Sequence, residues 1–302
     1  MIYWLSYLYF PASLAIFLIL RRRTGLFLKA LLVVAFLGMS VLAYARFVEP
    51  RILLTVAKTI EVDRCVPGGA STRFALIGDT HIGEFANAMP VSRIARSINK
   101  IDPDFTLFVG DFTYQIDPDK IVSTFRPLGA LKRPVYAVLG NHDVGYPGPL
   151  YGQILPDGLT EAGLRMIDNQ SLTIELNGVN WELVGLSDEW EGKQDLSLVA
   201  STPTVPRILM THNPETSLKL PSGSFDLMVA GHTHGGQILL TEELTCRLAP
   251  VSCGLERVGL KETDAGKVFV TSGTGMVGLP MRLRVPPRIH VINLVLPDCD
   301  AG

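Results

Sequence analysis

Residues 230–237 read Ala-Gly-His-Thr-His-Gly-Gly-Gln and directly follow the apolar run Phe225–Ala230. A buried strand that ends in this way places the imidazoles of His232 and His234 beyond its carboxyl end, where ligands bind in open α/β sheets. The glycines of the stretch keep bulky side chains off the rim, so a ligand can approach the backbone. Paired histidines are often surface residues. The stretch alone therefore does not indicate a functional site, and the evidence for one comes from similar stretches elsewhere in the chain.

Four other apolar runs also end on Asp, Asn or His. They lead into Asp79 with His81, into Asp111, into Asn141 with His142 and Asp143, and into His212. Of the six histidines of the chain, only His290 lies inside an alternating stretch and has the pattern of an ordinary strand residue. Asp and Asn at a strand end commonly form turns, but five such blocks together favour a functional site.

The five blocks, in this order, resemble the calcineurin-like metallophosphoesterase family, whose pattern is D-x-H, G-D, G-N-H-D/E, H and G-H-x-H. The resemblance covers about Thr72 to Leu294, and no ligand position of the pattern is missing. It implies an α/β fold, a four-layer αββα sandwich, and a metal-dependent phosphohydrolase.

The resemblance also implies a dinuclear metal site. Two divalent cations about 3.5–4 Å apart can neutralise phosphoryl oxygens and activate a water molecule. By resemblance the first metal would be held by Asp79, His81 and His234, the second by Asn141, His212 and His232, and Asp111 would bridge them. Such mixed nitrogen and oxygen ligands suit Mn, Fe, Zn or Co, and the sequence does not choose among these metals.

By the same resemblance His142 is the catalytic residue, which would donate a proton or a hydrogen bond to the leaving oxygen. Many relatives place an Asp three residues after the bridging Asp to orient this histidine. This chain has Tyr114 at that position. We expect Asp143 or a backbone carbonyl to replace the missing carboxylate.

The first 45 residues are far more apolar than the rest of the chain. Ile2–Leu20 carries no charge, and Leu26–Ala45 carries only Lys29. Each stretch has about the 20 residues that a helix needs to span a bilayer. Because neither stretch has a polar face, two buried core helices are the weaker interpretation. We expect a transmembrane hairpin over residues 1–45, preceding the αββα domain.

An export signal is the alternative interpretation of the same region. Residues 22–29 resemble a twin-arginine signal, and Ala43-Tyr-Ala45 resembles a cleavage site. Extra residues after the arginines and an apolar segment in front depart from that pattern. Both interpretations place the basic cluster Arg21–Arg23 in the cytoplasm and the following domain outside. We therefore expect an inner-membrane protein with an extracytoplasmic catalytic domain.

Residues 46–71 are expected to form a juxtamembrane connector with a first strand at Leu54–Val62, and residues 72–302 the metallophosphoesterase domain. Apolar spacing and a first-turn proline predict helices in this domain. They are expected at Val91–Ile101, Pro118–Leu131 and Pro149–Gly163.

In the second half of the chain, the sequence signals for strands are clear in some stretches and absent in others. Asn177-Gly178 between two alternating runs predicts a β-hairpin. Thr241–Gly266 shows no period and is expected to be a long loop or a short helical excursion, and Val268–Thr271 and Ile289–Leu296 are expected to close the sheet.

Four cysteines, Cys65, Cys246, Cys253 and Cys299, all follow the apolar region, and none has metal-ligand spacing with the histidines. An even set in an exported domain predicts disulfides, with Cys246–Cys253 as the local pair and Cys65–Cys299 joining the two ends of the domain. Four free thiols are the alternative.

Three arginines, Arg282, Arg284 and Arg288, flank Pro286-Pro287 near the carboxyl end. Arginines so placed could contact a phosphate or an anionic headgroup. We expect instead that they form a solvated surface.

The predicted function is metal-dependent hydrolysis of a phosphoester at the membrane surface, with an envelope lipid or another phosphomonoester or phosphodiester as substrate. The net charge of −2 gives no basic field, so no nucleic-acid partner is expected.

Bacterial members of the family with the same GHTHGGQ ending include hydrolases of UDP-2,3-diacylglucosamine in lipid A synthesis. A cytoplasm-facing enzyme of that kind is one alternative, although its compartment conflicts with the expected topology. A non-catalytic, metal-stabilised binding module is the alternative from another class, and the intact ligands with His142 argue against it.

Overall fold

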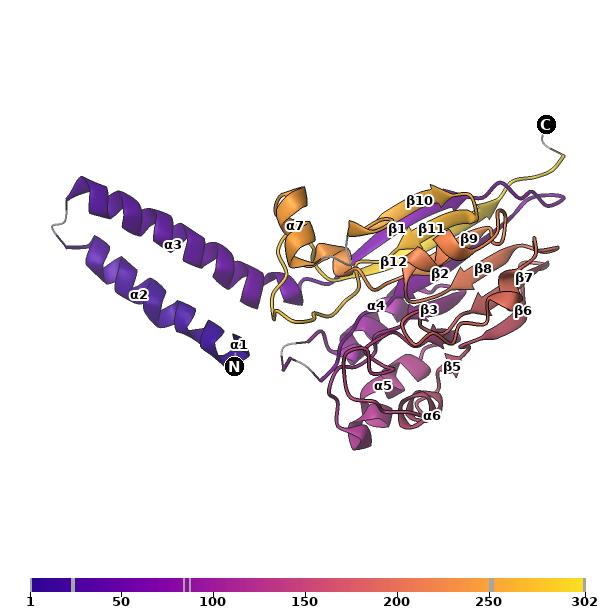
Figure 1. Ribbon diagram of the computed structural model, residues 1–302, viewed down its shortest axis with the longest axis horizontal. Helices are drawn as coiled ribbons and strands as arrows, with labels where there is room; N and C mark the ends of the chain where they lie inside the picture. Colours follow the sequence, from indigo (N-terminus) through magenta and orange to yellow (C-terminus); the bar gives the residue numbers. More distant parts are fainter. Residues whose placement is uncertain (1, 23–24, 84, 87, 250–252, 301–302) are drawn as a thin grey trace.

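The computed structural model describes residues 2–22, 25–83, 85–86, 88–249 and 253–300. Two six-stranded sheets pack against each other and form the centre of the α/β body, from which a helical hairpin projects (Figure 1). The interior between the sheets is apolar and includes Phe74 and Leu107 from one sheet and Leu183 and Ile208 from the other. Burial of this apolar surface is what holds the two sheets together.

The first sheet is parallel except where β12 meets β2 in antiparallel pairing. Its strands, in spatial order, are β1 (Leu54–Glu61), β12 (Arg288–Leu296), β2 (Ala70–Ile77), β3 (Phe105–Val109), β4 (Val135–Val138) and β5 (Arg165–Met166). The expected strands at Leu54–Val62 and Ile289–Leu296 are therefore both present, and the structure pairs them as neighbours.

The second sheet has four parallel central strands and an antiparallel strand at each edge. In spatial order it contains β10 (Gly259–Thr263), β11 (Gly266–Val270), β9 (Leu227–Ala230), β8 (Arg207–Met210), β7 (Val179–Gly185) and β6 (Gln170–Leu176). The expected hairpin joins β6 to β7, and both Asn177 (φ 54°) and Gly178 (φ 78°) adopt the left-handed conformation that such a turn requires.

Three helices cover the outer face of the first sheet in Figure 1: α4 (Val91–Ile101), α5 (Ile121–Gly129) and α6 (Ile154–Glu161). Ile94 and Phe125 from these helices pack against Phe108 of β3. The outer face of the second sheet is covered by short 3-10 segments and loops, among them η4 (Leu196–Val199), whose Val199 packs with Leu209 and Met228. The four-layer sandwich is thus confirmed, with a thin fourth layer.

The helix predictions differ from the structure chiefly at their ends. The helix at Val91–Ile101 has the expected bounds, whereas the next begins with the 3-10 turn η3 (Pro118–Lys120). The third starts only at Ile154, because the chain turns at Gly152 (φ 55°). Proline and glycine near a helix start mark the region of the boundary but not the residue.

The unperiodic stretch at 241–266 contains the helix α7 (Glu242–Leu248), which confirms a short helical excursion. The stretch also contains β10, which was not predicted. That strand is five residues long and pairs only with β11, so its half-exposed side chains lack the alternation of a buried strand. Residues 250–252 of this stretch lie outside the described residues.

The chain begins with an antiparallel helical hairpin that extends away from the α/β body (Figure 1). It consists of α1 (Ile2–Leu5), η1 (Ser6–Leu8), α2 (Tyr9–Leu20) and α3 (Leu26–Phe47). Tyr3–Leu20 and Leu26–Arg51 are long and apolar enough to cross a membrane, with mean hydropathies of 1.6 and 2.4. Almost none of this surface is buried, which excludes two core helices. Arg23 and Thr24 of the twin-arginine alternative lie outside the described residues.

The base of the hairpin is fixed to the α/β body by hydrogen bonds. The Ala45 carbonyl accepts from the backbone N–H of Arg282 at 2.9 Å, and the Glu49 carboxylate accepts from the backbone N–H of Val285 at 2.6 Å. Arg46, which is fully buried, donates to the Ser6 hydroxyl and lies 4.4 Å from the centre of the Tyr3 ring. The hairpin is therefore packed onto the body at its base.

The expected solvated surface of arginines is wrong for Arg282, which is fully buried. Its guanidinium donates to the carbonyls of Gly275, Val285 and Ser272 at 2.7 to 3.0 Å. The surrounding loop turns these carbonyls inward, and only a side chain with several N–H donors can satisfy all of them. Arg284 is exposed, as expected, and Arg288 is half-buried.

Both predicted disulfides are present. Cys65 and Cys299 are 234 residues apart in sequence, and their Cα atoms lie 5.0 Å apart. Cys65 follows β1 and Cys299 follows β12, so this bond joins the two ends of the domain, as expected. Cys246 and Cys253 form the local pair, with 5.6 Å between their Cα atoms.

Candidate metal centre

The candidate residues gather at one edge of the sandwich because each follows the carboxyl end of a strand. The positions are Asp79 and His81 after β2, Asp111 after β3, Asn141 and His142 after β4, His212 after β8, and His232 and His234 after β9. All of these side chains are buried. The predicted strand-end residues from both sheets therefore come together at a single site.

One group of ligand atoms, here called the first cluster, consists of Asp79, His81, Asp111 and His234, whose atoms lie within 4.8 Å of one another. The Nε2 atoms of His81 and His234 face each other at 2.9 Å. The Asp111 Oδ2 atom lies 3.3 Å from His81 Nε2, and the Asp79 Oδ1 atom lies 3.7 Å from His234 Nε2. Two carboxylates and two imidazoles thus converge on one point.

The second cluster consists of Asp111, His212 and His232. Nε2 of His212 lies 3.2 Å from the Asp111 Oδ2 atom and 3.2 Å from Nδ1 of His232. The Asn141 Oδ1 atom joins them, 2.9 Å from His232 Nδ1 and 3.1 Å from His212 Nε2. The Asn141 amide nitrogen donates to the Tyr146 carbonyl, which turns the oxygen of the amide toward the cluster.

The Asp111 carboxylate belongs to both clusters. Its Oδ2 atom faces one histidine of each cluster, and its Oδ1 atom accepts the backbone N–H of His142 at 2.9 Å. This hydrogen bond fixes the orientation of the carboxylate between the two groups. The position matches the bridging role expected for Asp111.

The arrangement fits divalent cations better than it fits a site without them. Nitrogen lone pairs 2.9 Å apart repel unless a proton or a cation lies between them. The Asp79 Oδ2 atom is buried and has no hydrogen-bond partner among the described residues. Nδ1 of His212 lies 2.8 Å from the Val109 carbonyl, which can only accept, so Nε2 of the neutral ring presents a lone pair to the second cluster.

The charges of the site support the same conclusion. Burial alone would raise the pKa of Asp111, but His212 and His81 beside it hold that pKa well below its usual range. Burial alone would lower the pKa of His212, but Asp111 raises it to about 10. Burial raises the pKa of Asp79 to about 6. A cation entering the second cluster would therefore displace a proton from His212.

The backbone at the site is held in an uncommon conformation. Five of the site residues adopt left-handed φ angles: Asp79 (51°), His81 (44°), Asp111 (54°), His232 (70°) and His234 (51°). Each such residue costs on the order of 1–3 kcal/mol and persists only where the surroundings enforce it. Close packing contributes here, since a Cβ atom at Gly110 would lie 2.6 Å from His212 Nδ1, and one at Gly140 would collide with the Asp111 carboxylate.

His142 lies beside the clusters and belongs to neither. Its ring makes edge contacts with the rings of His81 and Tyr114, at 4.9 and 4.8 Å between centroids. Burial lowers the pKa of His142 to about 4, although Asp111 and the backbone of Pro147 oppose the shift. Tyr114 thus packs against the imidazole at the position where many relatives have a carboxylate.

Asp143 does not take over the orienting role that we expected for it. Its carboxylate accepts the backbone N–H groups of Phe112, Thr113 and Gly140 at 3.0 to 3.1 Å. These bonds tie the loop after β3 to the loop after β4. No backbone carbonyl takes over this role among the described residues, since Nδ1 of His142 is buried without a hydrogen-bond partner.

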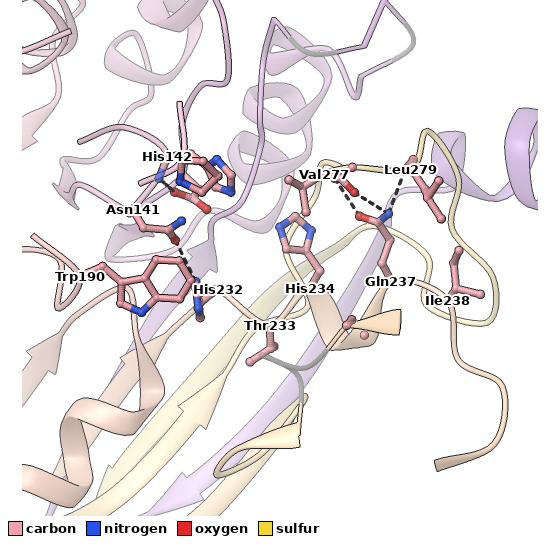
Figure 2. Close-up of a pocket in the computed structure, with 15 residues that line it drawn as sticks. Asn141, His142, Trp190, His232, Thr233, His234, Gln237, Ile238, Val277 and Leu279 are labelled. Atoms are coloured by element: carbon pink, nitrogen blue, oxygen red, sulfur yellow. Dashed lines mark hydrogen bonds between the residues drawn. The ribbon is translucent and has the colours of Figure 1, made fainter. Parts of the chain in front are cut away.

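A cavity of about 340 Å³ opens above the clusters. In Figure 2, Trp190 lies on the side of Asn141 and His232, and Val277, Leu279 and Ile238 lie on the other side, beyond His234. The Trp190 ring is 4.9 Å from the His232 ring and nearly perpendicular to it. Sequence reasoning missed these lining residues. Only Gln237, the last residue of the stretch at 230–237, gave a signal, through its place in the motif.

Comparison with known proteins places the site in a family. Residues 72–236 match the model of the calcineurin-like phosphoesterase family. The uncharacterized metallophosphoesterase YkuE of Bacillus subtilis (strain 168) is 28% identical over 260 residues, which cover 83% of this chain and 88% of that protein. Phosphodiesterase YaeI of Escherichia coli (strain K12) is 29% identical over 235 residues, 75% of this chain and 83% of that protein. A transmembrane protein with a metallophosphoesterase domain from Danio rerio is 28% identical over 240 residues, 74% of this chain and 53% of that protein.

Replacing Asp111 should disturb both clusters at once. Asp111→Asn removes the charge of the shared carboxylate, so metal affinity should fall by at least about tenfold at both positions, because even groups that only support a metal ligand contribute that much. Elemental analysis of the purified variant after dialysis against Mn checks this, with the exposed Asp119→Asn as a matched control. Wild-type metal content in Asp111→Asn would contradict the shared role.

Proposed function

We propose that this chain, which belongs to the calcineurin-like phosphoesterase family and is a metal-dependent phosphohydrolase, hydrolyses a phosphoester at the membrane surface with two divalent cations. The observation that carries the proposal is the Asp111 carboxylate, which the two clusters share. A shared carboxylate is the feature that a two-metal phosphoesterase needs to hold its cations at bridging distance.

The two clusters support a division of the ligands between two cations. In the proposal Asp79, His81 and His234 hold the first cation, Asn141, His212 and His232 hold the second, and Asp111 contacts both. Bound cations would neutralise the phosphoryl oxygens and activate the attacking water. The mixed nitrogen and oxygen donors suit Mn, Fe, Zn or Co.

His142 is proposed as the catalytic residue that assists the leaving group. Its imidazole lines the cavity beside both clusters, and its backbone N–H fixes it to the bridging Asp111. The buried ring is neutral at pH 7 and retains one N–H to donate to the leaving oxygen. A phosphate anion beside the ring would raise its pKa toward the range in which a proton is transferred.

Activity and the role of His142 can be tested together. The wild-type protein should hydrolyse bis-p-nitrophenyl phosphate in the presence of Mn and not after chelation. His142→Ala should keep its bound metal and lose about 10²–10⁴-fold in kcat with a poor alkoxide leaving group, but less with p-nitrophenolate. Equal losses with both leaving groups would refute a role as acid, and no hydrolysis by the wild type would favour the binding module.

The membrane location rests on the hairpin and on the cysteines. Residues 1–45 would anchor the chain, residues 46–71 would supply the connector and β1, and residues 72–302 would form the catalytic domain. Two cysteine pairs close enough for disulfides are typical of proteins outside the cytoplasm. The basic loop between the helices supports the same orientation, with the catalytic domain outside an inner membrane.

The substrate in this proposal is an envelope lipid or another phosphomonoester or phosphodiester that reaches the site from the outer side of that membrane. The cytoplasm-facing hydrolase of UDP-2,3-diacylglucosamine remains the second candidate, and the paired cysteines disfavour it because they suit an oxidising compartment.

Topology distinguishes these two candidates directly. A reporter active only outside the cytoplasm, fused after Gly302, should give signal, while a reporter that fluoresces only in the cytoplasm should not. The same two reporters fused after Gly25, between the helices, should give the reverse pattern and serve as the control. Cytoplasmic fluorescence alone from the Gly302 fusion would overturn the outside orientation and make the lipid A precursor the first candidate.

A further inference from the structure

The end of the cavity beyond His234 is built for an apolar group. Val277, Gly278 and Leu279 line it from one loop, and Ile238 lines it from the chain after the metal-binding turn (Figure 2). None of the described residues that line the cavity is a lysine or an arginine. A second phosphate or a carboxylate of the substrate would therefore find no charged partner in this part of the cavity.

Val277, Leu279 and Ile238 are here called the apolar wall, and the side chain of Gln237 holds this wall in place. Its amide nitrogen donates to the carbonyls of Val277 and Leu279 at 3.0 and 2.9 Å, and its amide oxygen accepts the backbone N–H of Val277 at 2.9 Å (Figure 2). The side chain is buried, so these three bonds are not in competition with bulk water. The glutamine thus helps to set the position of the loop that carries Val277 and Leu279, together with Arg282, whose guanidinium donates to the carbonyls of Gly275 and Val285.

Gln237 also joins this loop to the metal-binding turn. The backbone N–H of Gln237 donates to the His234 carbonyl at 3.1 Å, and its own carbonyl accepts from Leu283 at 3.0 Å. Gln237 is therefore bonded both to the loop that carries the wall and to the metal-binding turn.

The same loop continues into the contact with the membrane hairpin. Arg282 donates its backbone N–H to Ala45, and Val285 donates its backbone N–H to Glu49. The wall accordingly lies between the metal-binding turn and the base of the hairpin. An apolar chain that occupied the wall would lie close to the bilayer surface from which the hairpin emerges.

We propose that Gln237 is a positioning residue and that the wall of Val277, Leu279 and Ile238 selects phosphoesters that carry an apolar chain beside the phosphate. The inference rests on the proposed function and adds the class of substrate to it. Contact with the wall requires no charge on the organic group, and its strength grows with the apolar area that the group buries.

The test is a series of n-alkyl p-nitrophenyl phosphates, from methyl to hexyl, with the full-length protein in detergent and Mn. For the wild type kcat/KM should rise with chain length, by up to about fourfold per methylene group, through a falling KM. Gln237→Ala should keep its metal content and lose most of this dependence. Gln153→Ala, an exposed glutamine that bonds only to Asp157 among the described residues, should keep the full dependence and is the matched control.

Leu279→Ala removes part of the wall and leaves the bonds of Gln237 in place. If Gln237→Ala does not fold, Leu279→Ala still tests whether the wall selects substrates with an apolar chain. It too should flatten the dependence on chain length. Hydrolysis of the whole series at equal kcat/KM, or an unchanged dependence in both variants, would overturn the wall as a selector and leave the proposed function intact. Absence of hydrolysis at every chain length would instead overturn the proposed function itself.

Discussion

The buried carboxylate of Asp111 lies where the carboxyl ends of the two sheets meet, and it cannot remain charged there without nearby positive charge. His81 from one sheet and His212 from the other both face its Oδ2 atom, at 3.3 and 3.2 Å, and would hold the cations there in the proposed site. The requirement to bring these three groups together explains much of the local structure. Glycines pack against the carboxylate and the imidazole, and several of the site residues accept left-handed backbone angles that would be costly elsewhere.

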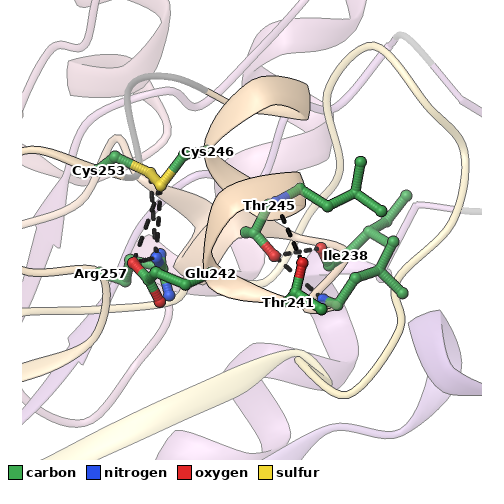
Figure 3. Close-up of a disulfide and its surroundings, with 9 residues drawn as sticks. Ile238, Thr241, Glu242, Thr245, Cys246, Cys253 and Arg257 are labelled. Carbon is green, nitrogen blue, oxygen red and sulfur yellow. Dashed lines mark hydrogen bonds and ion pairs between the residues drawn. A yellow bond between two sulfur atoms is a disulfide. The ribbon is translucent and has the colours of Figure 1, made fainter.

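The membrane hairpin, the loop at 277–285 and the metal-binding turn form one continuous set of contacts. Gln237 fastens the loop to the turn, and the backbone of Arg282 fastens it to the hairpin. The side chain of Arg282 donates to the carbonyls of Ser272 and Gly275, just before the loop, and of Val285 at its end, and so keeps the loop compact. Close to α7, Cys246 of the helix is bonded to Cys253 (Figure 3), and Ala249, which lines the cavity, lies between these two cysteines in the sequence. The apolar end of the cavity is thus built from elements close to the base of the hairpin.

Apolar runs with polar ends predicted the gathered site residues, and the even number and the positions of the cysteines predicted both pairs. The four-layer fold was implied by the resemblance to the calcineurin-like metallophosphoesterase family. What the sequence did not predict depends on contacts that no local sequence pattern marks. β10 is recognisable only through its pairing with β11. Asp143 was expected to orient the ring of His142, but its carboxylate accepts hydrogen bonds from backbone N–H groups of two loops instead. Arg282 has the charge of a surface residue, and its burial follows from carbonyls that the sequence does not orient.

The central feature of the proposed site is that two cations share Asp111. Crystals of the Mn-loaded protein, measured near the manganese absorption edge, test this claim directly. Two anomalous peaks about 3.5–4 Å apart, both within bonding distance of the Asp111 carboxylate, are the expected result. A single peak, or two peaks of which only one contacts Asp111, would contradict it.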